Sequence, residues 1–404
     1  MHILQKIYCR TFQTAFKLAL PVLPYRKPKI LDSIQELPDA LKDKGVSKIL
    51  LVTDKMLRNN GLTKDIETVL PENGVEVVVY DGTCPNPTAE NVEEAMGLFI
   101  WEECEAIVAF GGGSSIDCAK ACGARLANPN KTLKQMRGIL KVRRRLPLLV
   151  AIPTTAGTGS EVTLAAVITD EATHYKYPIN DFPLIPRMAV LEPKVTYSLP
   201  KHLTATTGMD ALTHAVEAYI GNSTTRETRR DALTATSLIF SNIETACREP
   251  ENEEARRNML QAAFLAGNAF SQSYVGYIHA VAHTLGGAYH IPHGLANSVI
   301  LPNVLEEYGE AAWKKLKDLA VAAGIAEKDT DPEEAANAFI AEIRAMNKRM
   351  GIPTKLRGIQ ERHIPKLARR ASAEANPLYP VPVLMNAKEL QKFYYQVMTE
   401  ENNV

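Results

Sequence analysis

The first half of the chain alternates short β-branched runs with helical patterns, and this alternation limits the fold more than any other feature of the sequence. Hydrophobic runs at 47–54, 75–82, 105–113 and 147–155 predict strands, and the segments that separate them have the apolar spacing of helices. Strands that alternate with helices favour right-handed crossovers and a parallel sheet. The first half therefore predicts a Rossmann-like α/β domain with a mostly parallel sheet.

The second half has a different texture. From about residue 200 the β-branched runs nearly vanish, and long helical patterns follow one another at 204–220, 226–247, 252–270, 276–289 and 294–307. Pro193 and Pro200 punctuate the chain where the texture changes. For these 404 residues we predict an N-terminal α/β dinucleotide-binding domain at 1–200 and an all-α metal-binding domain at 201–404, with a ligand cleft between them.

Charge and cysteine content exclude several classes of function. The chain carries 46 Lys+Arg and 46 Asp+Glu, so no net basic field draws it to nucleic acid or to an anionic membrane. Its six cysteines are scattered over a long chain, which is not the pattern of a disulfide framework. Reduced thiols fit a cytoplasmic protein, and we expect that location, with neither nucleic acid nor a membrane as partner.

The N-terminal segment predicts an amphipathic helix rather than a signal peptide. Apolar residues recur there at helical spacing, at Ile3, Leu4, Ile7, Tyr8, Phe12 and Phe16. Lys17 interrupts the apolar stretch, and no small-residue cleavage site follows. We expect this helix to pack on the chain's own fold or on a partner subunit.

Three glycines stand between the third predicted strand and the helix after it. Gly111, Gly112 and Gly113 would let a ligand approach the backbone closely, and the helix that follows offers free N–H groups to an anion. Ser114 and Ser115 add hydroxyl donors. An ordinary tight turn also uses glycine, but three in a row at a strand end favour a pyrophosphate site.

A second loop follows the fourth predicted strand. Thr154, Thr155, Thr158 and Ser160 lie among glycines there, which makes the loop a suitable ligand cradle, although a turn with helix caps would need the same residues. Asp54 ends the first predicted strand. Its carboxylate could bind a ribose 2′-hydroxyl and would repel a 2′-phosphate, which favours NAD over NADP. The alternative role for Asp54 is a helix N-cap.

Ligand-type residues gather in the helical half. Asp210 and His214 are four residues apart and therefore share a helix face. Four of the nine histidines follow within 15 residues, at His279, His283, His290 and His293. One carboxylate with three imidazoles suits Fe²⁺ or Zn²⁺, and a site with an open position would polarise a carbonyl or stabilise an alkoxide. Chemistry alone leaves open which of the histidines bind.

Four stretches together resemble one known family. They are GGGSSIDCAK (111–120), PTTAGTGSE (153–161), GMDALTHAVEAY (208–219) and HAVAHTLGGAYHIPHGLAN (279–297). Their order and spacing are similar to those of the iron-containing (group III) alcohol dehydrogenases from about residue 36 to 310. The resemblance implies a dehydroquinate synthase-like architecture. It also implies an NAD(H)-linked alcohol dehydrogenase or aldehyde reductase that transfers hydride between nicotinamide and an alcohol held by the metal through its oxygen.

The resemblance also assigns site residues. It implies the metal ligands Asp210, His214, His279 and His293, with Fe²⁺ the expected ion and Zn²⁺ the alternative. It leaves His283 beside the nicotinamide and the substrate, where this histidine or a relay through water and a ribose hydroxyl would move the proton. Together with the loop chemistry it gives a cofactor-binding set of Asp54, Asn86, Gly112, Gly113, Ser114, Asp117, Thr154, Thr155, Thr158 and Lys176.

Some positions depart from the family, and some alternatives stay open. The N-terminal extension is unusual, Asn303 stands where many relatives have histidine, and no arginine follows Asn376 and Pro377. A related enzyme of the dehydroquinate synthase or glycerol dehydrogenase kind would share the architecture, a small polyol is an alternative substrate, and a metal-binding homologue without activity is the non-enzymatic alternative. We expect a homodimer, the commonest assembly of soluble enzymes.

Overall fold

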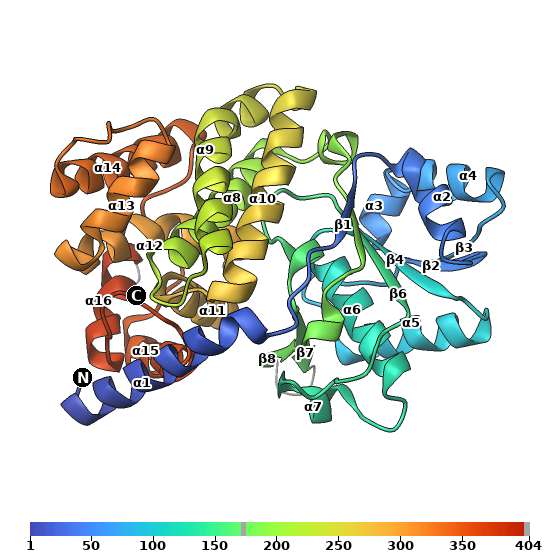
Figure 1. The fold of residues 1–404 in the computed structure, drawn as a ribbon, viewed down its shortest axis with the longest axis horizontal. Coiled ribbons are helices and arrows are strands. Elements are labelled where there is room, and N and C mark those ends of the chain that lie inside the picture. The colour runs from blue at the N-terminus through green and yellow to red at the C-terminus, as the bar shows by residue number, and fades with distance from the viewer. Residues whose placement is uncertain (171–174, 400–404) are drawn as a thin grey trace. The chain divides into compact units, whose positions relative to one another are not determined.

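The computed structural model describes residues 1–170 and 175–399 (Figure 1). It divides into two compact units, Pro24–Leu199 and the combination of Met1–Leu23 with Pro200–Val404. The predicted division at residue 200 placed residues 1–23 with the α/β domain, whereas in the structure their contacts are with the helical residues. Residues 1–23 belong to the helical unit because polar side chains of the first helix donate hydrogen bonds to carbonyls at residues 377–382.

A six-stranded parallel sheet forms the centre of the α/β unit. Its strand order is β1-β9-β6-β4-β2-β3, and the bounds are β1 (Lys29–Leu31), β2 (Lys48–Val52), β3 (Glu76–Tyr80), β4 (Ala106–Gly111), β6 (Leu148–Pro153) and β9 (Met188–Val190). The four predicted strands correspond to β2, β3, β4 and β6, so the mostly parallel sheet is confirmed. The sequence did not predict β1 and β9, because three residues are too few to show a period.

Apolar side chains cover both faces of this sheet. Along β4, Ile107 and Ala109 belong to one apolar cluster, and Val108 and Phe110 belong to the other. A strand buried on both faces is typical of a parallel sheet, and it explains why these runs are continuously apolar. The helices of this unit are α2 (Leu37–Lys42), α3 (Lys55–Asn59), α4 (Lys64–Glu72), α5 (Ala89–Trp101), α6 (Gly113–Ala127) and α7 (Leu133–Met136).

A small second sheet was not predicted from the sequence. β5 (Gly138–Ile139) pairs in parallel with β8 (Tyr175–Asn180), and β8 pairs antiparallel with β7 (Ala165–Asp170). Ala166 and Ile168 of β7 and Ile179 of β8 belong to the same apolar cluster as Ile107. The small sheet therefore extends one side of the core.

The helical unit confirms the long helical patterns of the second half. Its helices are α1 (Ile3–Ala19), α8 (Lys201–Ile220), α9 (Arg226–Arg248), α10 (Glu253–Ser273), α11 (Tyr277–Tyr289), α12 (His293–Tyr308), α13 (Glu310–Ala322), α14 (Pro332–Met350), α15 (Ile364–Ala375) and α16 (Ala387–Val397). Among the described residues, no helix combines the length and the apolar character that crossing a membrane requires.

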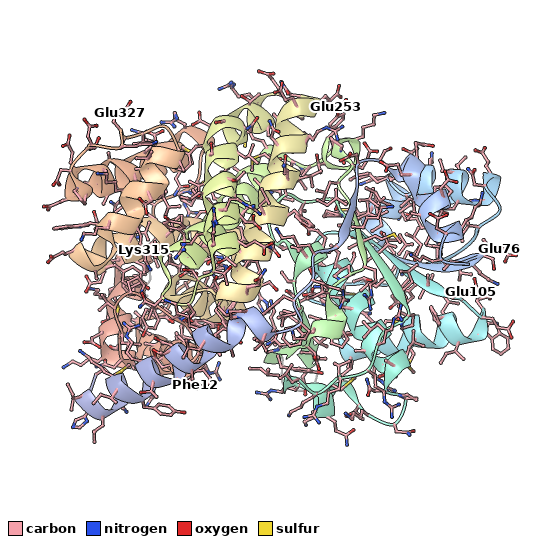
Figure 2. All side chains as sticks on the ribbon, in the orientation of Figure 1. Phe12, Glu76, Glu105, Glu253, Lys315 and Glu327 are labelled. Atoms are coloured by element: carbon pink, nitrogen blue, oxygen red, sulfur yellow. The ribbon has the colours of Figure 1, made fainter. Side chains whose placement is uncertain are left out.

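The N-terminal helix α1 packs mainly through residues outside its predicted apolar set, with Phe16 as the exception. The predicted apolar residues Ile3, Leu4 and Tyr8 are 66 %, 67 % and 62 % exposed, whereas Gln13 is 3 % exposed. Phe12, labelled in Figure 2, remains 39 % exposed. The helix was predicted correctly, but its apolar side does not cover the chain's own core.

Candidate metal centre and cofactor loops

Three helices of the helical unit bring one carboxylate and three imidazoles together. Asp210 and His214 lie one turn apart on α8, His279 lies in the first turn of α11, and His293 is the first residue of α12. One ligand-type atom from each of the four side chains lies within 4.8 Å of the other three. Asp210, His214 and His279 are buried, whereas the His293 side chain is 39 % exposed. The cluster is therefore enclosed by α8 and α11 and accessible at His293.

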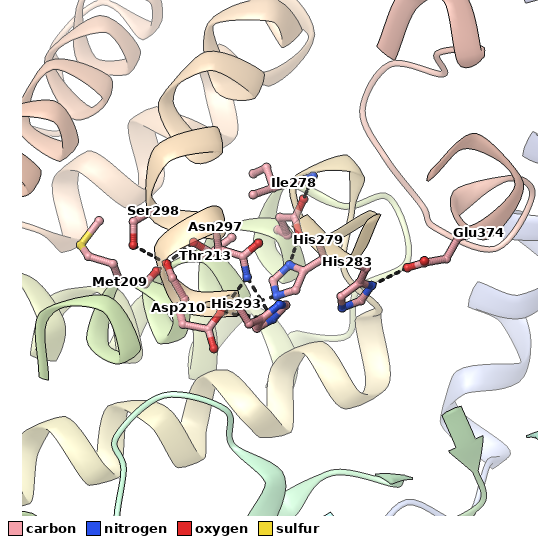
Figure 3. A network of polar contacts seen from close by, with 12 residues as sticks. Met209, Asp210, Thr213, Ile278, His279, His283, His293, Asn297, Ser298 and Glu374 are labelled. Atoms are coloured by element: carbon pink, nitrogen blue, oxygen red, sulfur yellow. Dashed lines mark hydrogen bonds and ion pairs between the residues drawn. The ribbon is translucent and has the colours of Figure 1, made fainter. Parts of the chain in front are cut away.

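A buried nitrogen of His279 tests whether a cation fits this cluster. Its Nε2 has no hydrogen-bond partner among the described residues, and Asp210 Oδ1 lies 3.9 Å from it. The same oxygen lies 3.5 Å from His293 Nε2 and accepts a hydrogen bond from Asn297 Nδ2 at 2.7 Å (Figure 3). Leaving a buried nitrogen without a partner costs free energy, and a divalent cation would remove that cost. Iron and zinc both accept this set of ligands.

Glu217, one turn after His214 on α8, holds the ring of His279. Its Oε2 lies 2.5 Å from His279 Nδ1, and its Oε1 accepts the backbone N–H of Ile278 at 2.9 Å. Burial raises the pKa of Glu217 to about 7 and lowers the pKa of His279 well below its usual value. A Cβ at Gly276 would lie 2.6 Å from Glu217 Oε1, so glycine makes room for the carboxylate. Burial keeps His279 neutral, and the Glu217 contact at Nδ1 leaves Nε2 toward the cluster, as metal binding requires.

His283 lies beside the four clustered residues without joining them. Its ring stacks on that of His293, with centroids 5.2 Å apart, and its Nδ1 lies 2.6 Å from Glu374 Oε1. The side chain of His283 is 42 % exposed. The remaining histidine of this region, His290, is exposed at the end of α11 in a left-handed conformation and is outside the cluster. The structure thus brings together the four residues that the family resemblance selected and separates His283 and His290 from them.

Sequence reasoning missed the polar side chains that hold these groups. Glu217 follows His214 by three residues, and Asn297 follows His293 by four, so each shares a helix face with a cluster member. Those spacings were the available signal. Glu374 gave no signal, because it contacts His283 from 91 residues away in the chain.

The two predicted cofactor loops lie side by side in the α/β unit. Gly111 has a φ of 150°, and a Cβ there would lie 2.4 Å from Ser115 Oγ, so the turn from β4 into α6 requires glycine. A Cβ at Gly113 would lie 3.1 Å from Thr158 Cγ2, and one at Gly112 would lie 3.6 Å from Thr155 Cγ2. The first helical turn of α6 and the hydroxyl-rich loop after β6 therefore form one surface, with N–H groups and hydroxyls suited to phosphates.

Several other predicted cofactor residues join this surface. Lys176 Nζ donates to Asn86 Oδ1 at 2.6 Å, and the Asn86 N–H donates to Ser114 Oγ at 3.2 Å. Thr154 follows directly after β6, and its N–H bonds to the carbonyl of Gly111 at 3.0 Å. These contacts place four predicted residues from distant parts of the sequence at the same end of the parallel sheet.

Asp117 and Asp54 have structural partners as well. Asp117 Oδ1 accepts the hydroxyl of Ser160 at 2.7 Å, and its Oδ2 accepts the N–H of Val167 at 3.0 Å, so this carboxylate fixes the hydroxyl-rich loop. Asp54 caps α3, accepting the N–H of Leu57 on Oδ1 at 2.9 Å. The N-cap alternative for Asp54 is therefore observed. A ribose contact through its other oxygen stays a prediction.

Comparison with known proteins agrees with this geometry. The family model of the iron-containing alcohol dehydrogenases matches residues 31–193. A second family model, of the C-terminal part of the Fe-containing alcohol dehydrogenase family, matches residues 204–398. The 1,3-propanediol dehydrogenase of Klebsiella pneumoniae is 40 % identical over 87 % of this chain and 92 % of its own length. The NAD-dependent methanol dehydrogenase of Bacillus methanolicus is 36 % identical over 84 % of this chain and 89 % of its own. A solved 1,3-propanediol oxidoreductase superposes with a TM-score of 0.88 at 36 % identity, over 93 % of this chain and 99 % of the other.

The chain belongs to the iron-containing alcohol dehydrogenase family. Membership confirms the expected fold class, an α/β domain with a helical domain in a dehydroquinate synthase-like architecture. It also confirms the expected enzyme class, an oxidoreductase of alcohols and aldehydes.

In this family member, a buried lysine and a buried glutamate lie at the predicted cofactor loops, Lys120 on α6 and Glu161 at the end of the hydroxyl-rich loop. Lys120 Nζ donates to the carbonyls of Thr163 and Ala165 at 2.9 and 2.8 Å and to Thr163 Oγ1 at 2.9 Å. Burial lowers the pKa of Lys120 to about 8 and raises the pKa of Glu161 to about 7. The sequence gave no sign of either role, because both follow from burial.

Glu161→Gln is expected to change how stability depends on pH. Because burial raises the pKa of Glu161 from 4.5 to about 7, the folded protein keeps a proton that the unfolded chain releases between these values. This contribution to the free energy of unfolding is complete below pH 4.5 and is lost as the pH rises to about 7. Between pH 5 and 7, the free energy of unfolding of the glutamine variant should fall by about 1–2 kcal/mol less than that of the wild type, as measured by urea unfolding. Exposed Glu72→Gln is the matched control, and equal pH slopes for Glu161→Gln and wild type would contradict the assignment.

Proposed function

We propose that this chain is a metal-dependent, NAD(H)-linked alcohol dehydrogenase or aldehyde reductase. The observation that carries the proposal is the cluster of Asp210, His214, His279 and His293, because nothing in the packing of three helices alone requires these four ligand-type groups to converge. The buried nitrogen of His279 gives the cluster a reason to hold a cation. The family to which the chain belongs gives the reaction class.

The four clustered residues are the proposed metal ligands, with Fe²⁺ as the expected ion and Zn²⁺ as the alternative. When bound, such an ion acts as a Lewis acid toward a substrate oxygen. The chain's own contribution is to hold the ligands in place. Glu217 fixes the tautomer of His279 through the 2.5 Å contact, and Asn297 orients Asp210 through the 2.7 Å hydrogen bond.

The loops of the α/β unit are the proposed cofactor site. The N–H groups at the start of α6 and the hydroxyls of Thr155 and Thr158 would bind the phosphates. Asn86 and Lys176, which bond to each other, would contact the same cofactor beside them. Bound NAD supplies the hydride acceptor, so the chain needs to supply binding and orientation. The methanol dehydrogenase relative is NAD-dependent by name, which supports NAD rather than NADP here.

His283 is the proposed proton-transfer residue. It lies one turn after His279, its ring stacks on His293, and its side chain is 42 % exposed. Glu374 holds its Nδ1, which leaves Nε2 to take the hydroxyl proton when an alcohol is oxidised and to return it when an aldehyde is reduced. A histidine that borders solvent can exchange this proton with water.

The substrate is proposed to be a small primary alcohol or diol. Two relatives are named for 1,3-propanediol and methanol, and both names describe short primary alcohols. We further propose a homodimer in the cytoplasm. Closed two-fold dimers are the commonest oligomers, and all six cysteines are free thiols, as a reducing compartment would keep them.

A single titration tests the proposed function. The protein is stripped of metal, Fe²⁺ or Zn²⁺ is added back without oxygen, and NADH absorbance is followed with short alcohols and diols, and with aldehydes in the reverse direction. We expect turnover that depends on the added metal, and the panel ranks the substrates. Tight binding of metal and NADH without turnover on any alcohol or aldehyde would contradict the proposal.

Asp54→Asn is expected to weaken the preference for NAD. Asparagine caps a helix as well as aspartate does, so α3 keeps its N-cap while the negative charge that would repel a 2′-phosphate is removed. The ratio of kcat/KM for NAD to that for NADP should fall about tenfold, which corresponds to roughly 1.4 kcal/mol. Exposed Asp65→Asn on α4 is the matched control. An unchanged ratio in Asp54→Asn would show that Asp54 is only a helix cap.

A further inference from the structure

The helix α1 makes a set of contacts that its apolar pattern did not predict. Arg10 Nη1 and Nη2 donate to the carbonyls of Val381 and Pro382, each at 2.7 Å. Gln13 Nε2 donates to the carbonyls of Pro377 and Tyr379 at 3.1 and 2.8 Å. Neither family match includes α1, since they cover residues 31–193 and 204–398. Two side chains of an N-terminal helix therefore bind four carbonyls in one short segment near the other end of the chain.

The segment that α1 binds has few hydrogen-bond donors of its own. Residues 376–386 connect α15 with α16, and Pro377, Pro380 and Pro382 have no backbone N–H. Buried carbonyls need donors, and a proline-rich segment must take them from elsewhere. Arg10 and Gln13 supply them. Gln13 is itself only 3 % exposed, and its Oε1 accepts from Arg10 at 2.9 Å, so the pair acts as one connected group.

The same segment carries the side chain that reaches the reacting end of the site. The Tyr379 hydroxyl donates to Glu374 Oε1 at 2.9 Å, and this oxygen is the one that lies 2.6 Å from His283 Nδ1. Tyr379 is 7 % exposed. Its ring lies 6.3 Å from that of Tyr274, which in turn meets Phe16 of α1 edge-on at 5.0 Å. The N-terminal helix thus supports Tyr379 through both its backbone and its ring.

We propose that α1 is an intramolecular clamp that positions His283 for proton transfer, acting through Tyr379 and Glu374. The inference rests on the proposed function and assigns positioning residues to it. Glu374 accepts a hydrogen bond from the Nδ1–H of His283, so that the lone pair on Nε2 is the one that takes the proton as the alcohol O–H bond breaks. The hydroxyl of Tyr379 holds the Glu374 carboxylate in the position from which this carboxylate contacts the His283 ring.

This partner matters because packing alone holds a side chain as exposed as His283 only loosely. The side chain is 42 % exposed, and an imidazole ring turns in a broad, nearly two-fold potential that exchanges the places of its two sides. Figure 3 shows Glu374 reaching His283 from the side away from Asp210 and Asn297. A carboxylate fixed there holds one tautomer and one orientation, as the third member of a catalytic triad does.

Two variants break the clamp at different points. Tyr379→Phe removes only the hydroxyl that holds Glu374, and the double variant Arg10→Met with Gln13→Met removes the four hydrogen bonds from α1 to the carbonyls. Both are expected to lower kcat about tenfold, within the range that general acid–base catalysis contributes. The KM for NAD and the amount of bound metal should stay at wild-type values, because none of the changed side chains contacts the four proposed metal ligands or the cofactor loops. The matched controls are Tyr395→Phe and Gln5→Met, both exposed.

An isotope effect separates positioning from a loss of folded protein. In D2O, the solvent isotope effect on kcat should rise in both variants, because a slower proton transfer limits turnover more fully. A variant that merely unfolds in part would lower kcat with an unchanged isotope effect and with reduced metal content, and that result would overturn the clamp. So would a kcat within twofold of wild type for Tyr379→Phe.

A conservative replacement at Glu374 completes the test. The amide oxygen of Glu374→Gln can still accept from His283 and Tyr379, whereas Glu374→Ala cannot, so kcat should be about tenfold higher in the glutamine variant than in the alanine variant. Equal kcat values in the two variants would overturn the inference. If the wild-type enzyme forms no NADH with any alcohol, the proposed function fails instead; a wild type that turns over while all clamp variants match it rejects the clamp alone.

Discussion

His293→Ala is expected to remove most of the bound metal and to lower kcat/KM by at least about 10²–10³. His293 provides one of four ligand-type groups that lie within 4.8 Å of one another, and three remaining groups hold a divalent ion less tightly. The substitution should leave the fold intact, because the side chain is 39 % exposed at the first position of α12. Elemental analysis of the purified protein and turnover with short alcohols measure the two effects.

The chain offers a close control for this experiment. His290 lies three residues earlier, is exposed, and is outside the cluster. Because His290 has a φ of 55°, His290→Asn is the suitable replacement, since asparagine tolerates the left-handed conformation. His290→Asn should keep its metal and its activity. Full metal occupancy in His293→Ala would show that the fourth ligand has been assigned wrongly.

Glu217→Gln is expected to weaken metal binding by about 10- to 100-fold while the four ligands remain in place. The carboxylate makes the 2.5 Å contact with His279 Nδ1, and a neutral amide of the same shape supports the imidazole less strongly as a metal donor. Competition with a chelator measures the affinity. The metal-free variant should unfold with a free energy within about 1 kcal/mol of wild type, since the exchange removes a buried charge and weakens a hydrogen bond together.

Exposed Glu254→Gln on α10 is the matched control for Glu217→Gln and should bind metal as the wild type does. An affinity for metal that is unchanged in Glu217→Gln would mean that the helix backbone alone fixes His279. A large loss of stability in the metal-free protein would mean that Glu217 mainly supports the fold around Gly276, whose missing side chain makes room for it.

The sequence predicted those strands and helices whose local apolar pattern is enough to determine them. β4 is apolar along its whole length because both its faces are buried, and such a run is visible without a structure. β1 pairs with β9 over three residues, and pairing that short depends on the neighbouring strand rather than on its own side chains. The helical period of α1 was equally visible. Which side would pack was not, since Gln13 finds its acceptors 364 and 366 residues away.

The candidate site divides in the same way. Asp210 and His214 could be predicted from their four-residue spacing, and the glycines at 111–113 from their place between a strand and a helix. Selecting His279 and His293 over His283 and His290 needed the family resemblance. Glu374 could not be found by either route, because its proposed role depends on a contact across 91 residues of chain. Groups that position others were missed more readily than the groups they position.

The attachment of α1 to residues 377–382 also fixes an order of events during synthesis. Arg10 is synthesised 371 residues before Val381, and Gln13 is synthesised 366 residues before Tyr379. At about 5–20 residues per second, roughly 20–70 s pass before Pro382 exists. For that time α1 has no docking site, while Leu4 and Leu18 are available to any other apolar surface. The proposed proton-transfer side can therefore form only after the proposed metal ligands on α8, α11 and α12 have all been made.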